Sequence, residues 1–343
     1  WVVAMIFFLV LCCCWGAISL GIAVFKTTAQ YVQKNMKIFL MPLIVLGLVL
    51  LWFSLWLVGV VFVWSVGEPM PREGMSFLTE MKWSDETRYI FIYFVFGLLW
   101  VNAWFVGMSQ FATAASASLW YFECGSDSEG KGTMGRAMKW SFRYHIGSIA
   151  FGSFIIAVCQ IIRLIFEYYR RKLGMADKGK KLVKVLLCIT GYLLWMMEKC
   201  VKFMAKKAYI QVALTNKFFC RSAFNAFALI LKHMHRFAIA GGIGWIFAMF
   251  GIITITGTTC FCAWLFFSNS TAIEVTSPWG PVIAIGIVTV VISHSMLSIF
   301  TFSSDAILQS FILDEELGFQ GRSRPKYMES FAEKVKGKKG SCC

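Results

Sequence analysis

Charged residues are scarce in this sequence. They make up 15% of its 343 residues, while 58% of the residues are hydrophobic. A soluble domain carries about 25% charged residues. Several apolar runs are longer than the roughly 20 residues that span a ~30 Å hydrocarbon core, and the short alternating strands of a membrane barrel are missing. These features exclude a soluble globular domain and predict an all-α, polytopic helical membrane protein.

Acidic residues are the rarer charged class, with 18 Asp and Glu against 33 Lys and Arg. The resulting net charge of +15 is typical of the cytoplasmic loops of a membrane protein. No nucleic-acid-binding module accompanies the positive charge, so we expect no nucleic-acid partner.

Motifs for chemistry are also lacking. The sequence shows no nucleophile–base pattern, phosphate loop or zinc-ligand spacing, and the "GGIG" run at 241–244 follows no strand, as a dinucleotide fingerprint would. We therefore expect no catalytic residues, no metal and no cofactor, and the chain is not predicted to be an enzyme.

Cysteine is present twelve times. Those inside apolar runs are typical small packing residues. The clusters at the two ends of the chain are candidates for lipidation, because the tail "KVKGKKGSCC" joins a polybasic segment to two terminal thiols; a disordered tail is the alternative. The lipidation candidates are Cys12, Cys13, Cys14, Cys342 and Cys343.

About seven or eight hydrophobic segments are expected, together with amphipathic helices at the membrane interface. The hydrophobic segments visible in the sequence are 1–14, 37–66, 89–122, 145–171, 185–199, 241–267 and 282–303. Residues 15–35 and the amphipathic stretch "FCRSAFNAFALILKHMHRFA" are predicted to lie along the interface. This organisation gives a transmembrane domain over residues 1–313 and a basic, cytoplasmic C-terminal tail over 314–343.

The distribution of positive charge leaves the topology of residues 144–236 open. This region begins and ends on basic, cytoplasmic-looking sequence, so it contains an even number of crossings. If segments 145–171 and 185–199 both cross, the loop "RRKLGMADKGKKLVK" with its seven cations lies outside, against the positive-inside rule. If neither crosses, a long apolar helix lies at the interface. We favour two crossings, because apolar length is a direct free-energy constraint.

Several long segments resemble the choline transporter-like family of eukaryotic membrane proteins. They are "RYHIGSIAFGSFIIAVCQIIRLIFEY" (143–168), "LLWMMEKCVKFMAKKAYIQVALTNKFFCRSAFNAF" (193–227), "FTFSSDAILQSFILDEE" (300–316) and "RPKYM" (324–328). The segments keep the order and spacing of the family. The resemblance covers about the last two-thirds of the chain well, and weaker similarity extends through 98–122 toward the N-terminus.

The resemblance implies a multi-pass transporter of choline or a related amino alcohol such as ethanolamine, in the plasma membrane or an organelle membrane. With no ATP-binding domain in the sequence, transport would be secondary or facilitative, by alternating access. Family members usually have a further N-terminal helix and a large extracellular domain, so we expect this chain to be N-terminally truncated. The expected partners are a choline-like organic cation and membrane lipids, and the sequence leaves open an oligomer or larger complex. A non-transporting accessory subunit with the same fold is the alternative, followed by a membrane enzyme acting on lipid headgroups.

A quaternary ammonium is held by aromatic faces, with Trp the best. Two i, i+4 tryptophan pairs stand in apolar helices together with polar residues, and they are the substrate-binding candidates. Ordinary aromatic packing is the competing interpretation, since aromatic residues make up 17% of the chain. The candidates are Trp52, Trp56, Trp100, Asn102, Trp104 and Gln110.

Ionisable residues at membrane depth mark functional sites by default. Arg163 and Glu167 stand one turn apart, and we expect them to form a structural ion pair with each other. Glu198 is expected to pair with the lysines beside it. Asp305 is a candidate for a cytoplasmic gate or a tail anchor. His294, between two serines, is a candidate proton-linked switch or a hydrogen-bonded packing residue.

Overall fold

The computed structural model describes residues 15–72, 75–124, 132–176, 181–269, 277–318 and 324–340. These form long helices and one small β-hairpin, so the predicted all-α polytopic fold is confirmed. The cysteine clusters at 12–14 and 342–343, proposed for lipidation, lie outside the described residues.

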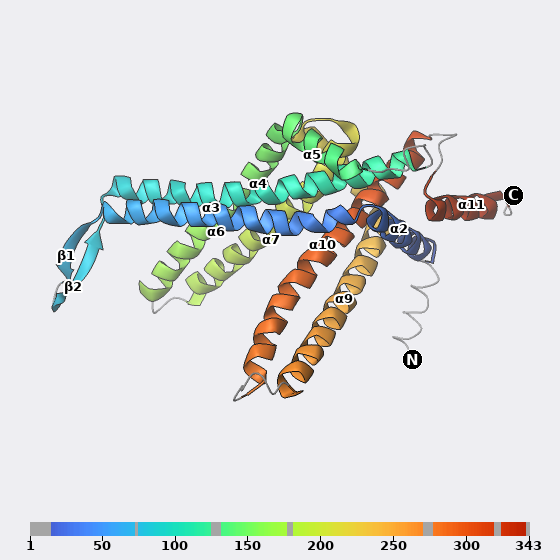
Figure 1. Cartoon of the computed structure of the whole chain (residues 1–343). Helices are drawn as coiled ribbons and strands as arrows, with labels where there is room; N and C mark the ends of the chain where they lie inside the picture. The colour runs from blue at the N-terminus through green and yellow to red at the C-terminus, as the bar shows by residue number, and fades with distance from the viewer. Residues whose placement is uncertain are drawn as a thin grey trace.

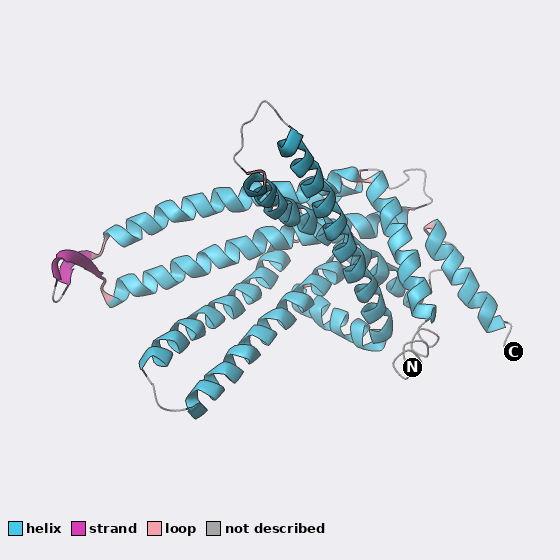
Figure 2. Ribbon diagram, turned by 90° about the horizontal axis from the view of Figure 1, so that it is seen from below, coloured by secondary structure: helices cyan, strands magenta, loops and turns pink. Residues whose placement is uncertain are grey.

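Three helical hairpins fan out from a shared core (Figures 1 and 2). They are α3 (Leu40–Ser65) with α4 (Asp85–Glu123), α6 (Ile146–Ala176) with α7 (Lys181–Thr215), and α9 (Met234–Asn269) with α10 (Trp279–Leu317). The remaining helices lie around the core: α2 (Trp15–Lys34), η1 (Met36–Phe39), α5 (Thr133–Arg143), α8 (Phe219–Lys232) and α11 (Lys326–Gly340).

Five of the described helices are long and apolar enough to cross a membrane: Met36–Ser65, Asp85–Glu123, Ile146–Lys172, Met234–Ser268 and Trp279–Leu317. Helix α7 is not among them, because its uncharged run at 185–197 is shorter than the roughly 20 residues needed. It nevertheless packs against α6 as the second arm of a hairpin (Figure 1). This is the geometry expected if both segments of 144–236 cross.

The Gly-, Pro- and acid-rich sequence at the tip of the α3–α4 hairpin predicts a loop. Instead β1 (Glu68–Arg72) and β2 (Met75–Lys82) pair antiparallel, with Glu68 opposite Lys82. Helix α5 begins directly after Gly132, which lies in the left-handed region at φ 72°. Its amphipathic pattern buries Met134 and Ala137.

The hairpin arms bury little, and the core lies where α4 and α10 end. Each of these helices has 39 residues, roughly 58 Å at 1.5 Å per residue, about twice a ~30 Å hydrocarbon core. Nearly all of their buried residues lie in the C-terminal part, 107–121 of α4 and 299–314 of α10. The core therefore forms beyond the apolar arms, at one end of the molecule.

Small residues let the helices of the core approach closely. The run "ATAASAS" at 112–118 is fully buried and packs against α2 and α10. A Cβ at Gly152 would lie 2.5 Å from the Phe219 ring and 2.7 Å from the Tyr209 hydroxyl. Glycine is required there because no other residue leaves room for these two side chains.

Helix α2 contributes more than the interfacial connector expected from sequence. Leu20, Val24 and Tyr31 are fully or almost fully buried. The Tyr31 hydroxyl donates to Ser116 at 2.8 Å, and burial raises the pKa of Tyr31. The predicted boundary at 313/314 falls inside α10, which continues to Leu317, and Met328 of α11 is fully buried against the core.

Candidate functional site

A ladder of polar contacts joins the three helices α4, α7 and α10 inside this core, and we call it the polar seam. It consists of Lys207 with Asp305, Gln211 with Gln309, Ser118 with Ser310, and Tyr121 with Asp314. Burying a polar side chain in an apolar helix costs free energy unless the side chain has a hydrogen-bond or ion-pair partner. The seam supplies such partners across helix boundaries.

The partners show how the helices are aligned. From the Lys207–Asp305 pair to the Gln211–Gln309 pair, both helices advance by four residues, so α7 runs parallel to α10. From Ser118–Ser310 to Tyr121–Asp314, α4 and α10 also advance together. All three are second arms of hairpins, which return toward the core in the same direction (Figure 1).

Lys207 is the first member of the seam on the side of the diverging hairpins. Its side chain is only 7% exposed, and its ammonium lies 2.8 Å from the Asp305 carboxylate. The same ammonium lies over the rings of Phe203 and Phe237, 5.5 Å from each ring centroid. A carboxylate and two aromatic faces therefore surround one cation, contributed by α7, α9 and α10.

The far end of the seam is tied to the C-terminal segment. The Asp314 carboxylate accepts hydrogen bonds from Tyr121 at 3.2 Å and from Arg324 at 2.6 Å. The Arg324 guanidinium also lies 5.9 Å from the Phe311 ring centroid. Asp314 is almost fully buried, so these two donors compensate a charge that would otherwise be isolated in the core.

The tryptophan candidates do not converge on one cavity. The Trp56 indole donates to the Phe94 carbonyl across the α3–α4 pair at 2.9 Å, whereas the Trp100 indole donates to the Ala150 carbonyl of α6 at 3.1 Å. Trp104 packs on the cluster formed by α4, α6 and α7. The Trp52 and Trp104 indole nitrogens are buried without a hydrogen-bond partner among the described residues.

One polar candidate on α4 has an unsatisfied hydrogen-bonding atom, and a second lies near such an atom. The amide oxygen of Asn102 is buried without a hydrogen-bond partner in the described part of the chain. Gln110 is half-buried one turn from Thr113, whose hydroxyl is likewise buried and unpartnered there. These groups can accept or donate to a bound hydroxyl.

The expected pair of Arg163 with Glu167 is wrong. Arg163 contacts Glu198 of α7 at 2.8 Å, and Glu167 instead contacts Arg170 and Arg171 at 2.7 and 3.1 Å. The hairpin brings the Glu198 carboxylate within reach of α6, which position along one helix does not reveal. The expected pairing of Glu198 with a neighbouring lysine is confirmed, with Lys202 at 2.5 Å.

His294 lies exposed on α10, outside the packed interfaces. Its position therefore supports neither the switch nor the packing interpretation. Asp305 is at the seam as described. Within the described ranges, no three His, Cys, Asp or Glu side chains converge as a metal site needs.

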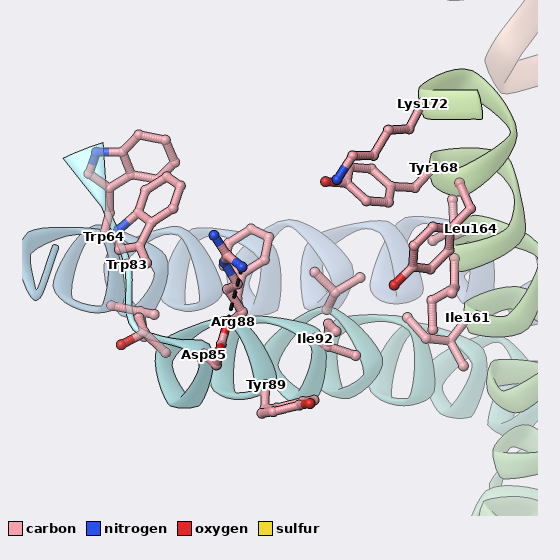
Figure 3. Close-up of a pocket in the computed structure, with 16 residues that line it drawn as sticks. Trp64, Trp83, Asp85, Arg88, Tyr89, Ile92, Ile161, Leu164, Tyr168 and Lys172 are labelled. Carbon is pink, nitrogen blue, oxygen red and sulfur yellow. Dashed lines mark hydrogen bonds and ion pairs between the residues drawn. The ribbon is translucent and has the colours of Figure 1, made fainter. Parts of the chain in front are cut away.

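A concavity lies outside the core, between the tip of the α3–α4 hairpin and the outer part of α6 (Figure 3). Its volume is about 790 Å³. The lining has aromatic faces such as Trp64 and Trp83, but Asp85 is already paired with Arg88 at 3.0 Å. Lys172 adds a positive charge. The lining therefore carries a net positive charge, which disfavours a cation.

Sequence reasoning singled out Asp305 but missed Lys207, Gln211, Gln309 and Asp314. Their signal was the spacing of polar residues one turn apart, at 207 and 211 and again at 305 and 309, within otherwise apolar helical sequence. Each pair alone is unremarkable. Their meaning depends on the two helices lying side by side in register.

Comparison with known proteins places this chain in a family. Residues 1–316 match the family model described as plasma-membrane choline transporter. The choline transporter-like protein 5 of Xenopus tropicalis is 27% identical over 368 residues, covering 94% of this chain and 51% of the relative. The choline transporter-like protein 2 of Danio rerio is 32% identical over 247 residues, covering 69% of this chain and 35% of the relative. The chain spans about half the length of the first of these relatives and about a third of the second. Because the family model matches most of the chain, the chain belongs to the plasma-membrane choline transporter family.

Proposed function

We propose that this chain moves choline or a related amino-alcohol cation across a membrane, as a secondary or facilitative transporter working by alternating access. Family membership supports the substrate class. The substrate and direction are proposals for the whole protein, of which this chain corresponds to about half the length of several relatives.

The observation that carries the proposal is the polar seam. It closes the end of the molecule where α4, α7 and α10 meet, while the three hairpins diverge toward the other end (Figure 2). Contacts such as Gln211–Gln309 can be replaced by hydrogen bonds to water at little net cost once the helices separate, because a typical hydrogen bond contributes only about 1 kcal/mol net. A seam of this kind suits a gate that opens and closes, with the cytoplasm as the side it faces.

The tryptophans of α4 are the proposed walls of the path that leads to the seam. Trp100 keeps an aromatic face beside Phe96 and Phe154, at centroid distances of 6.0 and 5.5 Å. The unpartnered Asn102 oxygen supports a role in accepting the substrate hydroxyl.

Uptake of radiolabelled choline into proteoliposomes tests the proposal. We expect uptake above that of protein-free liposomes, inhibited by unlabelled choline. Uptake equal to that of protein-free liposomes would contradict transport and favour an accessory membrane subunit. A Trp100→Ala, Trp104→Ala double variant should transport more slowly; normal transport by this variant would remove these residues from the path and leave the function standing.

A further inference from the structure

The environment of the Lys207 ammonium matches what an organic cation needs. A quaternary ammonium donates no hydrogen bonds and is held by aromatic faces, with a carboxylate adding charge. Asp305 supplies the carboxylate at 2.8 Å, and Phe203 and Phe237 supply the two rings at 5.5 Å. Lys207 thus occupies a cation site built by its neighbours.

We propose that the Asp305–Phe203–Phe237 group is a binding site for the substrate cation, and that Lys207 is a tethered cation that fills it when the substrate is absent. This inference rests on the proposed function. It adds a binding site for the transported cation and identifies Lys207 as a side chain that competes with the cation for that site. The competition follows from charge: with Lys207 in place the Asp305 carboxylate is already paired, and Lys206 also lies within electrostatic reach of it, so a second cation gains little from Asp305.

The position of the site fits this role. Asp305 comes before Gln309 and Asp314 along α10, so the cation site is the member of the seam nearest the diverging hairpins. A cation arriving from that side reaches Asp305 before it meets the closed part of the seam. Asp305 remains 31% exposed, whereas Lys207 is 7% exposed, so the carboxylate is accessible while its present partner is not.

The three side chains come from three helices, so binding at the site can affect how these helices pack against one another. Phe203 lies on α7, Phe237 on α9 and Asp305 on α10. When Lys207 withdraws, the direct charge contact between α7 and α10 is lost, and the bound cation replaces it with contacts to all three. Substrate occupancy and the packing of these helices are therefore coupled through one carboxylate.

Equilibrium binding of radiolabelled choline to the purified full chain tests the site. In Lys207→Met the tethered cation is removed, and we expect choline to bind at least several-fold more tightly than in the parent protein. Asp305→Asn added to this variant should abolish the gain. Lys199→Met is the matched control, because Lys199 also lies over a ring of its own helix, 5.6 Å from the Trp195 centroid, and should leave affinity unchanged. Equal or weaker choline binding by a folded Lys207→Met protein would overturn the proposal.

A second variant covers the case in which Lys207→Met fails to fold. Phe237→Leu keeps the ion pair of Lys207 with Asp305 and removes one aromatic face. The lysine retains its contact with the carboxylate, whereas choline donates no hydrogen bond and depends more on the rings, so choline binding should weaken by up to roughly 30-fold. Unchanged affinity in this variant would also overturn the site. Uptake by the parent protein with no effect of either variant would reject the site and spare transport, whereas tighter choline binding by Lys207→Met without any uptake would reject transport and spare the site.

Discussion

Gln211 of α7 donates a hydrogen bond to Gln309 of α10 across 3.1 Å, one helical turn beyond the ion pair of Lys207 with Asp305. Both amides are almost fully buried. The two contacts fix α7 and α10 in parallel register. They place Asp305, the carboxylate of the seam that is partly exposed, beside the buried Lys207.

The amide pair should be worth more than its own hydrogen bond. Gln309→Met leaves the Gln211 amide buried without its acceptor, and we expect a loss of about 1–3 kcal/mol in the free energy of unfolding. Replacing both glutamines with Met should recover most of this loss. Thermal unfolding in one detergent would measure it, and a double variant no more stable than the single variant would contradict the pairing.

Gly152 tests the close packing of α6 against the core. Gly152→Ala places a Cβ within 3 Å of Phe219 and Tyr209, so we expect a loss of about 1–3 kcal/mol, the usual cost of overpacking. Gly147→Ala is the matched control on the same helix, because nothing lies within 4 Å of its Cβ. The control should be neutral or slightly stabilising. Equal melting temperatures for the two variants would show that α6 does not approach Tyr209 as described.

Arg324 should stabilise the core through the buried Asp314. Arg324→Gln leaves Tyr121 as the sole donor to this carboxylate among the contacts described, and removing one partner of a buried ion pair costs about 3–5 kcal/mol. Lys326→Gln, an exposed position in the same segment, should change stability little. Limited proteolysis would report release of the C-terminal helix in the first variant and not in the second.

His145 predicts a pH dependence of stability. Burial lowers the pKa of His145, which contacts the Phe111 ring at a centroid distance of 4.8 Å. The unfolded chain therefore binds a proton more readily than the folded chain, and stability falls as the pH falls through about 6.5 toward the folded value. His145→Asn should reduce this loss, and His235→Asn, at an exposed position, should not. Identical pH profiles for the parent and His145→Asn would contradict the prediction.

The sequence predicted the helices better than the contacts between them. Long apolar runs gave most of the spanning helices, and the amphipathic pattern around 219–232 gave α8, because periodicity reports which face is buried. Arg163 shows the limit. Its best candidate partner within one helix was Glu167, but Glu198 of α7 is brought beside it by the hairpin, and the register between helices is not encoded in local spacing.

The seam escaped the same reasoning for a related reason. The composition of residues 185–210 is apolar first and basic later, which does not reveal that Lys207 and, just beyond this stretch, Gln211 face α10. His294 shows the reverse error, since a histidine between two serines suggested a packed interface and lies exposed instead. Asp305 was recognised because a carboxylate in an apolar helix is costly wherever it lies.

The central claim is that the seam must open for choline to pass, and a cross-link across it tests this most directly. In a Gln211→Cys, Gln309→Cys double variant, a short bismaleimide should join α7 to α10. Choline uptake into proteoliposomes should then fall to the level of protein-free liposomes, while each single variant keeps, after the same treatment, the uptake that it shows before treatment. Undiminished uptake by the cross-linked double variant would contradict the account.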